Sequence, residues 1–282
     1  MHNWSLTSVV TRQESDRLRT LLPASIAPPL HFDIAADLGL VFTGGMTSQF
    51  VEFTTRFVKK IVGRPEWVSQ EEEAYRRLRN KGFAPASIID VGAYEGSWTR
   101  LARRVFPDIP VLMVEAQEGK RAILERTCAE LPGVSLASAA LGAVTGETVT
   151  FYEMETGSSL MPERSNVPRL ARNLTLRTLD EVASGFAGPL FLKVDVQGAE
   201  LQVLAGGTET LDRAAAVQLE VAMLPYNKGA PTMLEIISFM DERGFVPFDV
   251  SGSSRPNGVD LVQLDLLFVR RDSPLRETFF NF

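Results

Sequence analysis

The most chemically suggestive segment of the chain is DVGAYEG, at residues 90–96. Its two glycines permit a tight turn and a close approach of the backbone to a ligand. A dinucleotide-binding loop has the pattern G-x-G-x-x-G, but Tyr94 stands where the middle glycine would be. The acid at position 90 would repel a pyrophosphate and attract a cation or an amine. The segment therefore indicates a loop for a positively charged ligand, formed by Asp90, Gly92, Ala93, Tyr94 and Gly96.

A second acid stands where a ribose would be bound. Glu115 ends the next apolar segment, 25 residues after Asp90. In nucleotide-binding α/β folds, an acid at this place accepts hydrogen bonds from ribose hydroxyls. S-adenosylmethionine combines a ribose with a sulfonium and an ammonium, so it suits both acids. An ordinary strand-to-helix turn and a solvated Glu115 are the alternatives.

Six segments, in this order, resemble the FkbM-type methyltransferases, a family within the Rossmann-like class of S-adenosylmethionine enzymes. They are IIDVGAYEGSWT (88–99), VEAQ (114–117), RTLDEV (177–182), FLKVDVQGAELQVLAGG (191–207), QLEV (218–221) and QLDLLFVRRDS (263–273). The resemblance covers about residues 86–272, and its most specific block is 193–200. It implies S-adenosyl-L-methionine as the cofactor. It also implies O-methylation of a small-molecule acceptor, such as a hydroxyl of a sugar, a polyketide or a related secondary metabolite.

The resemblance also implies roles for single residues. Ser138 and Ala139 would flank the adenine, and Asp195 would lie near the methionine part of the cofactor and near the acceptor. The family often has Asn where Tyr94 stands, so this position departs from its pattern. The expected cofactor-binding residues are Asp90, Gly92, Ala93, Tyr94, Gly96, Glu115, Ala116, Ser138, Ala139 and Asp195.

A hydroxyl is a poor nucleophile, so a base or a metal ion would help the transfer. Asp195 and Glu220 end neighbouring expected strands, and they could act as base and orienter or ligate a divalent cation through oxygen. The alternative is that Asp195 caps a helix near Gly198 and Glu220 is a strand-end charge. His31 could supply a base from the N-terminal part, although a single histidine among apolar residues is more often a packing residue. No cluster of histidines or cysteines has the spacing of a zinc site. Whether the reaction needs another metal ion stays open.

The elements that must position these residues alternate along residues 85–282. We expect strands at 87–91, 111–115, 134–139, 148–152, 190–195, 215–221, 245–250 and 261–270, and helices at 97–106, 118–131, 199–211 and 232–243. Such alternation predicts right-handed crossovers and a doubly wound, Rossmann-like α/β fold. A Gly/Ser/Asn loop joins the last two strands, which predicts a terminal antiparallel pair on a mostly parallel, seven-stranded sheet.

Residues 1–84 are predicted to be a helical N-terminal extension that acts as a lid or an oligomer contact, with helices at 12–22, 46–62 and 69–81. Phe50, Phe53 and Phe57 could roof the acceptor site, but such a stripe is more often core or a dimer contact. A homodimer is therefore a candidate assembly. The loop at 156–168 is the other candidate for acceptor contact, with a solvated loop as the alternative.

The composition restricts the class of partner. The net charge is −6, and a protein that grips phosphate backbones should be basic, so we expect no nucleic acid. A single cysteine, Cys128, excludes an intrachain disulfide and fits a cytoplasmic setting. The chain has no run of 18 apolar residues and no secretion signal at its start, so we expect no membrane association.

Two other functions fit the same architecture. The first is an NAD(P)-dependent oxidoreductase, against which Tyr94 argues because it interrupts the dinucleotide pattern. The second is a catalytically silent protein that binds a cofactor or serves as a scaffold. The acids at positions 90, 115 and 195 argue against that second function.

Overall fold

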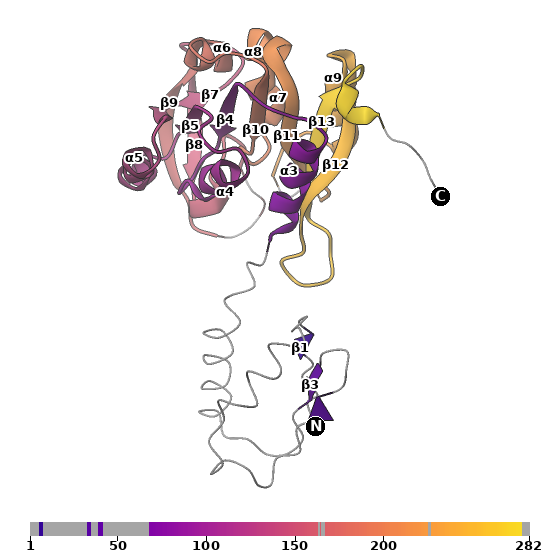
Figure 1. The fold of residues 1–282 in the computed structure, drawn as a ribbon. Helices are drawn as coiled ribbons and strands as arrows, with labels where there is room; N and C mark the ends of the chain where they lie inside the picture. The colour runs from indigo at the N-terminus through magenta and orange to yellow at the C-terminus, as the bar shows by residue number, and fades with distance from the viewer. Residues whose placement is uncertain are drawn as a thin grey trace. The chain divides into compact units, whose positions relative to one another are not determined.

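The computed structural model describes residues 68–162, 164, 167–224 and 227–277, and in the N-terminal part only three short strands (Figure 1). The chain divides into two units, Met1–Trp67 and Val68–Phe282. The described strands of the first unit form an antiparallel sheet of order β1-β3-β2, made of β1 (Leu6–Thr7), β2 (Asp33–Ile34) and β3 (Gly39–Val41).

Several sequence predictions fall outside the described residues. They are the helices at 12–22 and 46–62, the phenylalanines at 50, 53 and 57, and the candidate base His31. The role of the N-terminal part as a lid or an oligomer contact stays a prediction.

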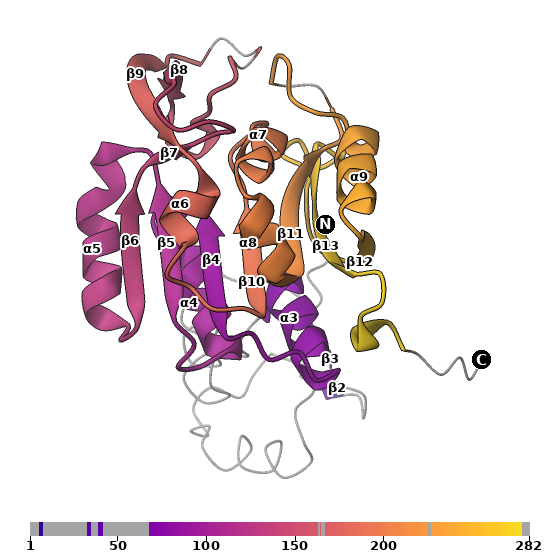
Figure 2. The same cartoon turned by 90° about the horizontal axis from the view of Figure 1, so that it is seen from above.

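A seven-stranded sheet of order β12-β13-β11-β10-β4-β5-β6 organises the second unit (Figure 2). Its parallel strands are β4 (Ser87–Val91), β5 (Val111–Glu115), β6 (Val134–Ser138), β10 (Leu190–Val194) and β11 (Ala214–Ala222). The last two strands of the chain, β12 (Phe245–Ser254) and β13 (Gln263–Arg270), pair antiparallel. The predicted mostly parallel sheet with a terminal antiparallel pair is confirmed. Strand β13 lies between β11 and β12, so the antiparallel strand is internal to the sheet.

Helices cover both faces of this sheet (Figures 1 and 2). One face carries α3 (Gln70–Asn80), α4 (Ser97–Val105) and α5 (Arg121–Glu130). The other carries α6 (Leu179–Ala183), α7 (Glu200–Ala205), α8 (Thr208–Arg213) and α9 (Met233–Glu242). Successive side chains of a strand point to opposite faces, so Phe191 enters the first core and Leu192 the second.

Helix α3 belongs to the second unit, whereas the sequence pattern predicts residues 69–81 as part of the N-terminal extension. Its buried stripe contains Ala74, Tyr75 and Leu78. The ring of Tyr75 meets Phe191 of β10 edge-on, with the ring centroids 5.2 Å apart. An amphipathic helix must bury such a stripe, and here the sheet provides the surface.

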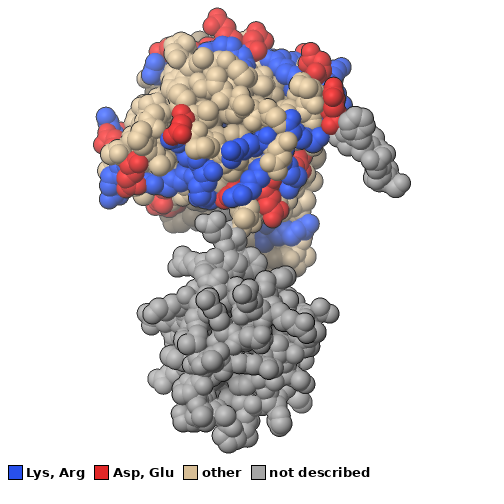
Figure 3. All heavy atoms as spheres, in the orientation of Figure 1, with Lys and Arg blue, Asp and Glu red and all other residues tan. Residues whose placement is uncertain are grey.

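The face that carries α3 and α4 gathers many lysines and arginines (Figure 3). These charges are partly neutralised by acids on the same surface. The nearly buried carboxylate of Glu72 pairs with Arg76 at 2.7 Å and with Arg104 at 2.9 Å, and Arg77 pairs with Asp249 at 2.8 Å.

The region between β6 and β10 differs most from the sequence prediction. The predicted strand near 148–152 is β8 (Thr148–Glu153), but it lies in a separate sheet of order β7-β9-β8, with β7 (Ala140–Leu141) and β9 (Leu170–Arg177). Strand β9 and helix α6 were not predicted. The short 3-10 turn η3 (Glu155–Gly157) lies within this region, and another, η2 (Glu118–Lys120), directly precedes α5.

The predicted helix at 199–211 is interrupted, because α7 ends and α8 begins at Gly206 and Gly207. A Cβ atom at Gly206 would lie 2.2 Å from the carbonyl oxygen of Gly142. The two chain segments therefore touch at a place where no side chain fits. After β13 the chain forms η4 (Pro274–Arg276). None of the helices in the described ranges is both long and apolar enough to cross a membrane.

Candidate active site

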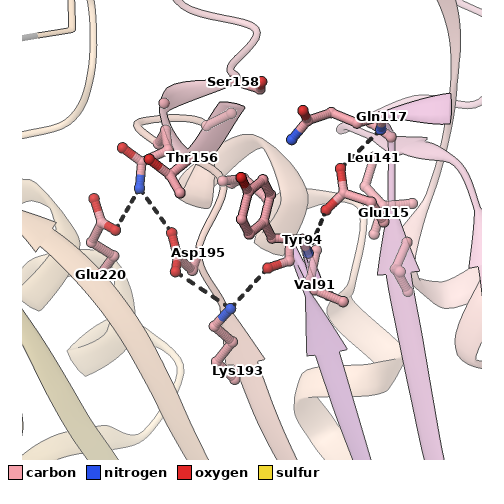
Figure 4. Close-up of a pocket in the computed structure, with 18 of the residues that line it drawn as sticks. Val91, Tyr94, Glu115, Gln117, Leu141, Thr156, Ser158, Lys193, Asp195 and Glu220 are labelled. Carbon is pink, nitrogen blue, oxygen red and sulfur yellow. Dashed lines mark hydrogen bonds and ion pairs between the residues drawn. The ribbon is translucent and has the colours of Figure 1, made fainter. Parts of the chain in front are cut away.

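A cavity of about 480 Å3 opens at the carboxyl ends of the parallel strands (Figure 4). Residues that end or follow β4, β5, β10 and β11 form its walls. In the sheet, β5 lies on one side of β4 and β10 on the other, so the cavity stands where the strand order reverses. Ligands of open α/β sheets bind at such a switch point. The volume lies within the roughly 300–1,000 Å3 of small-molecule pockets.

The structure brings most of the predicted site residues to this cavity. Those that line it are Gly92, Ala93, Tyr94, Glu115, Ala116, Ala139, Asp195 and Glu220. Asp90, Gly96 and Ser138 are not among the lining residues. Gly96 instead begins α4 with a left-handed φ of 78°, and Ser138 is exposed at the end of β6.

Glu115 ties the end of β5 to the loop that follows β4. Its two carboxylate oxygens accept hydrogen bonds from the backbone N–H groups of Tyr94 at 2.7 Å and Gln117 at 2.8 Å. The side chain is nearly buried. Burial raises the pKa of Glu115, although the backbone hydrogen bonds oppose the shift. The carboxylate therefore holds the loop in place and also faces the cavity (Figure 4).

Asp90 lies beneath the cavity and is fully buried. Its Oδ2 accepts a hydrogen bond from the Thr99 hydroxyl at 2.7 Å, and its Oδ1 lies 3.2 Å from Nζ of Lys193. Its charge therefore acts on the cavity through Lys193 and not by direct contact. The strand-end position of Asp90 is visible in the sequence, but the neighbours that bury it come from α4 and β10.

Gly92 shows how closely the tips of β4 and β10 approach each other. Its φ is 76°, and a Cβ atom there would lie 1.8 Å from the carbonyl oxygen of Asp195. A residue with a side chain would meet both a steric clash and an unfavourable backbone conformation. The first glycine of the loop is thus required by the contact between two strands.

A network of four side chains forms the opposite side of the cavity (Figure 4). Nζ of Lys193 donates to the carbonyl oxygen of Gly92 at 3.0 Å and lies 3.4 Å from Oδ2 of Asp195. The amide nitrogen of Gln197 donates to Oδ1 of Asp195 at 3.0 Å and to Oε2 of Glu220 at 2.6 Å. Burial would raise the pKa of Asp195, but the charge of Lys193 and these hydrogen bonds outweigh it, so the pKa is lowered.

The lining of the cavity is rich in acids. Over the described part of the chain, its charged residues are the carboxylates Glu95, Glu115, Asp195 and Glu220 and the ammonium of Lys193. The ammonium already donates a hydrogen bond to Gly92 and forms ion pairs with Asp90 and Asp195. An anionic ligand would therefore be repelled, whereas a cationic ligand would be attracted.

A short segment before β9 roofs the cavity through Thr156, Gly157, Ser158 and Leu160 (Figure 4). Contacts of Glu155 hold this roof. Its carboxylate accepts hydrogen bonds from the Tyr94 hydroxyl and from Nζ of Lys120, both at 2.7 Å. Its carbonyl oxygen accepts one from the side-chain amide of Gln117 at 3.1 Å. The predicted contact loop at 156–168 therefore reaches the cavity through its first residues.

Several lining residues were not predicted as site residues. Lys193 and Gln197 stand within the block at 193–200, and Lys193 shares a strand face with Asp195 because side chains alternate along a strand. That alternation could have identified Lys193. Ser254 and Gln263 pair across the hairpin of β12 and β13, and no local pattern marks them.

No group of three or more His, Cys, Asp or Glu side chains is arranged to hold a metal ion in the part of the chain that the structure describes. Asp195 and Glu220, the predicted oxygen ligands, are bridged there by the amide of Gln197.

The strand order and the cavity at the switch point define a Rossmann-like fold of the class I methyltransferase type. The family described as "Methyltransferase FkbM domain" matches residues 90–247, more than half of the chain. The chain therefore belongs to the FkbM methyltransferase family, as its sequence motifs predicted.

No curated protein matches the chain. Among solved structures, magnesium protoporphyrin IX methyltransferase from Synechocystis is 13% identical, with a TM-score of 0.42 over 80% of this chain and 86% of that one. A putative RNA methyltransferase from Pyrococcus horikoshii is 13% identical, with a TM-score of 0.40 over 70% and 81%. A precorrin-6y C5,15-methyltransferase from Geobacter metallireducens is 10% identical, with a TM-score of 0.40 over 71% and 87%. Neither a ligand nor an acceptor is carried over from similarities this distant.

Proposed function

We propose that this methyltransferase uses S-adenosyl-L-methionine and methylates a hydroxyl of a small secondary metabolite or a sugar. One observation carries the proposal: the cavity at the switch point is lined by four carboxylates and by one ammonium that already forms ion pairs with two aspartates. Such a cavity favours a ligand with positive charge. Among cofactors that contain a ribose, S-adenosylmethionine has that charge in its sulfonium and ammonium groups.

The residues around the cavity fit the parts of this cofactor. The loop at 92–94 suits the methionine part through its backbone polar groups, and the carboxylate of Asp195 suits the sulfonium of that part. Glu115 suits the ribose, since its oxygens can accept hydrogen bonds from hydroxyls. Ala139 and Leu141 offer an apolar wall for the adenine.

The acceptor is proposed to lie in the cavity beside Asp195 and Glu220, which the side-chain amide of Gln197 bridges. When bound, S-adenosylmethionine supplies a methyl group that its sulfonium has already activated. Glu220 accepts the hydroxyl proton, and Asp195 orients the acceptor, because Lys193 and Gln197 hold Asp195 as a carboxylate. Trp98 and Phe151 are apolar residues of the cavity lining, and they help to exclude water from the reacting atoms.

Calorimetry with S-adenosylmethionine and with NADH tests the cofactor. We expect S-adenosylmethionine to bind with a dissociation constant between about 1 μM and 1 mM, the usual range for enzyme ligands. Binding of NADH alone would favour the oxidoreductase alternative and would overturn the proposal.

A transfer assay tests the acceptor. Labelled methyl donor is incubated with uncharged polyols and sugars, with amines and with RNA, each before and after treatment with a chelator. Label on a hydroxyl is the expected outcome, and activity that is lost on chelation and restored by one metal would identify a required cation. Label on nitrogen or on RNA would contradict the proposed acceptor. Binding of the donor with no transfer to any acceptor would favour the scaffold alternative.

A further inference from the structure

Lys193 is the charged residue of a strand that is otherwise apolar and buried throughout. Its side chain is only 6% exposed and reaches the floor of the cavity. Burying an isolated ammonium is costly, so such a residue needs partners for its charge and its hydrogens.

The partners of Lys193 are one hydrogen-bond acceptor and two carboxylates in ion-pair contact. They are the carbonyl oxygen of Gly92 at 3.0 Å, Oδ1 of Asp90 at 3.2 Å and Oδ2 of Asp195 at 3.4 Å. Burial alone would lower the pKa of Lys193, but the two aspartates outweigh it and raise the pKa above its usual value. The lysine therefore stays charged, and its charge is compensated by the two aspartates.

The same contacts join the two sides of the cavity. Gly92 belongs to the loop after β4, whereas Asp195 follows β10, and their backbones already touch. Lys193 binds both, and Gln197 holds the second oxygen of Asp195. The carboxylate of Asp195 is thus fixed in place and has a permanent counter-ion.

We propose that Lys193 is a positioning residue that keeps Asp195 charged and in place, so that the cavity selects the positively charged methyl donor over its uncharged-sulfur product. The inference rests on the proposed use of S-adenosylmethionine. The donor carries a sulfonium, whereas the product, S-adenosylhomocysteine, carries a neutral thioether in the same position. A charged Asp195 can distinguish the two, and a protonated Asp195 cannot.

Other titratable groups also interact with Lys193 and belong in any pH experiment. They are Asp90 on β4, Glu115 at the end of β5, Asp195 after β10, Glu71 on α3 and Asp265 on β13. Burial, assisted by the charges of Asp195 and Glu71, raises the pKa of Asp265 to about 7. The pH dependence of donor affinity in the wild type therefore contains a contribution from Asp265 near neutral pH. Comparing each variant with the wild type at the same pH separates that contribution from the effect of Lys193.

The test compares donor and product affinity by calorimetry from about pH 6 to pH 8.5 in the wild type and in Lys193→Met. Without the ammonium, the carboxylate of Asp195, whose side chain is 34% exposed, loses its counter-ion and its pKa rises, so donor binding weakens by up to about tenfold per pH unit below the new pKa. We expect the donor affinity of Lys193→Met to be about tenfold or more below that of the wild type at pH 6. At pH 8.5 it should recover to the wild-type value or better. Affinity for the product should change less than about threefold, because no sulfonium is involved.

Three further variants make the result decisive. Lys193→Arg keeps the charge and should restore a wild-type difference between donor and product. Gln197→Leu removes the hydrogen bond from Gln197 to Asp195. It should shift the pH dependence of donor affinity in the same direction as Lys193→Met, by a smaller factor. This variant keeps the test available if Lys193→Met does not fold. Lys228→Met replaces an exposed lysine that does not line the cavity and should leave both affinities unchanged.

Two outcomes would overturn the inference. One is a Lys193→Met protein with the wild-type preference for the donor at every pH. The other is an equal loss of donor and product affinity at every pH, which would assign Lys193 to stability alone. A wild type that binds neither compound would instead refute the proposed function.

Discussion

The two sides of the cavity are built in different ways. On the side of β4 and β5, the polar side chain binds backbone, since Glu115 accepts the N–H groups of Tyr94 and Gln117. On the side of β10 and β11, polar side chains bind one another, through Lys193, Asp195, Gln197 and Glu220. The first side has a shape held by local hydrogen bonds, whereas the second has a charge pattern held by a network.

This difference separates two tasks. A backbone loop tied to a strand end is suited to hold a cofactor in one position, because few of its groups can move independently. A side-chain network can set the net charge next to the acceptor, and that charge depends on every member of the network. Changes on the first side should therefore alter binding and stability, and changes on the second should alter pH dependence.

Gly92→Ala should have the largest effect, because Gly92 is where the two sides touch. The new Cβ atom would lie 1.8 Å from the Asp195 carbonyl oxygen at a φ of 76°. We expect the variant to lose about 3 kcal/mol or more of unfolding free energy, together with donor binding. Thermal denaturation and calorimetry measure both. Gly146→Ala is the matched control, with a φ of 90° and open space, and it should lose only about 1 kcal/mol. Equal losses would show that the strand tips are not in close contact.

Glu115→Ala tests whether the first side depends on its carboxylate. The substitution leaves the N–H groups of Tyr94 and Gln117 without their acceptor. Donor affinity should fall about 10- to 100-fold, corresponding to roughly 1.5–3 kcal/mol for hydrogen bonds to a charged group. The chain should remain folded by circular dichroism. Glu118→Ala, at an exposed acid three residues along, is the control and should bind like the wild type. Unchanged affinity in Glu115→Ala would remove this residue from the site.

Glu200→Gln tests the pH dependence of the second side. Oε1 of Glu200 accepts the N–H groups of Val196 and Gly198, which form the turn after β10. Burial raises its pKa to about 7 from the ordinary 4.5, although these hydrogen bonds oppose the shift. The folded protein thus holds the proton more tightly than the unfolded chain does. This stabilisation is complete below about pH 4.5 and is lost as the pH rises to about 7.

The glutamine keeps an oxygen for both N–H groups but cannot ionise. Between about pH 5 and pH 7.5, we expect the wild type to lose on the order of 1–3 kcal/mol more unfolding free energy than the variant. Chemical denaturation at each pH measures the difference. Asp265 titrates in the same range in both proteins, so its contribution cancels. Parallel stability curves for the two proteins would contradict the prediction.

Tyr94→Phe should have the smallest effect, because it removes only one of the hydrogen bonds that join the first side to its roof. The Tyr94 hydroxyl donates to Glu155 at 2.7 Å and accepts from Lys120 at 3.0 Å. A loss of about 0.5–1.5 kcal/mol should make donor dissociation roughly 2- to 10-fold faster. Stopped-flow fluorescence measures the rate. Tyr152→Phe, on β8 and away from the lining, is the control. If both variants released the donor at the wild-type rate, the roof contacts would have no role in retaining it.

The sequence predicted the parts of the fold that depend on local patterns. Apolar runs identified all seven strands of the main sheet, and the loop at residues 90–96 identified one side of the cavity. The strand β9 was not predicted, because its first four residues, 170–173, are all exposed and show no alternation with buried ones. The break between α7 and α8 was also missed, because Gly206 and Gly207 are needed only where Gly142 and Leu179 approach them.

The sequence also predicted only those parts of the candidate site that depend on local patterns. Gly92, Tyr94 and Glu115 belong to one continuous motif and the strand after it, so their spacing was sufficient to bring them together. Ser254 and Gln263 reach the cavity only because β13 inserts between β11 and β12. An insertion of that kind is decided by the packing of the whole sheet, which no local pattern records.

The sequence by itself determined that acids follow the strands of an α/β sheet and that a glycine-bearing loop stands beside them. Short-range spacing and strand alternation are enough for that, because both are properties of a few consecutive residues. Only the tertiary structure decided that Asp90 turns inward to Lys193 and that Asp195 remains at the cavity. The physical reason is that a buried charge takes its position from the partners that neighbouring strands bring within reach, and the register of the assembled sheet sets those partners.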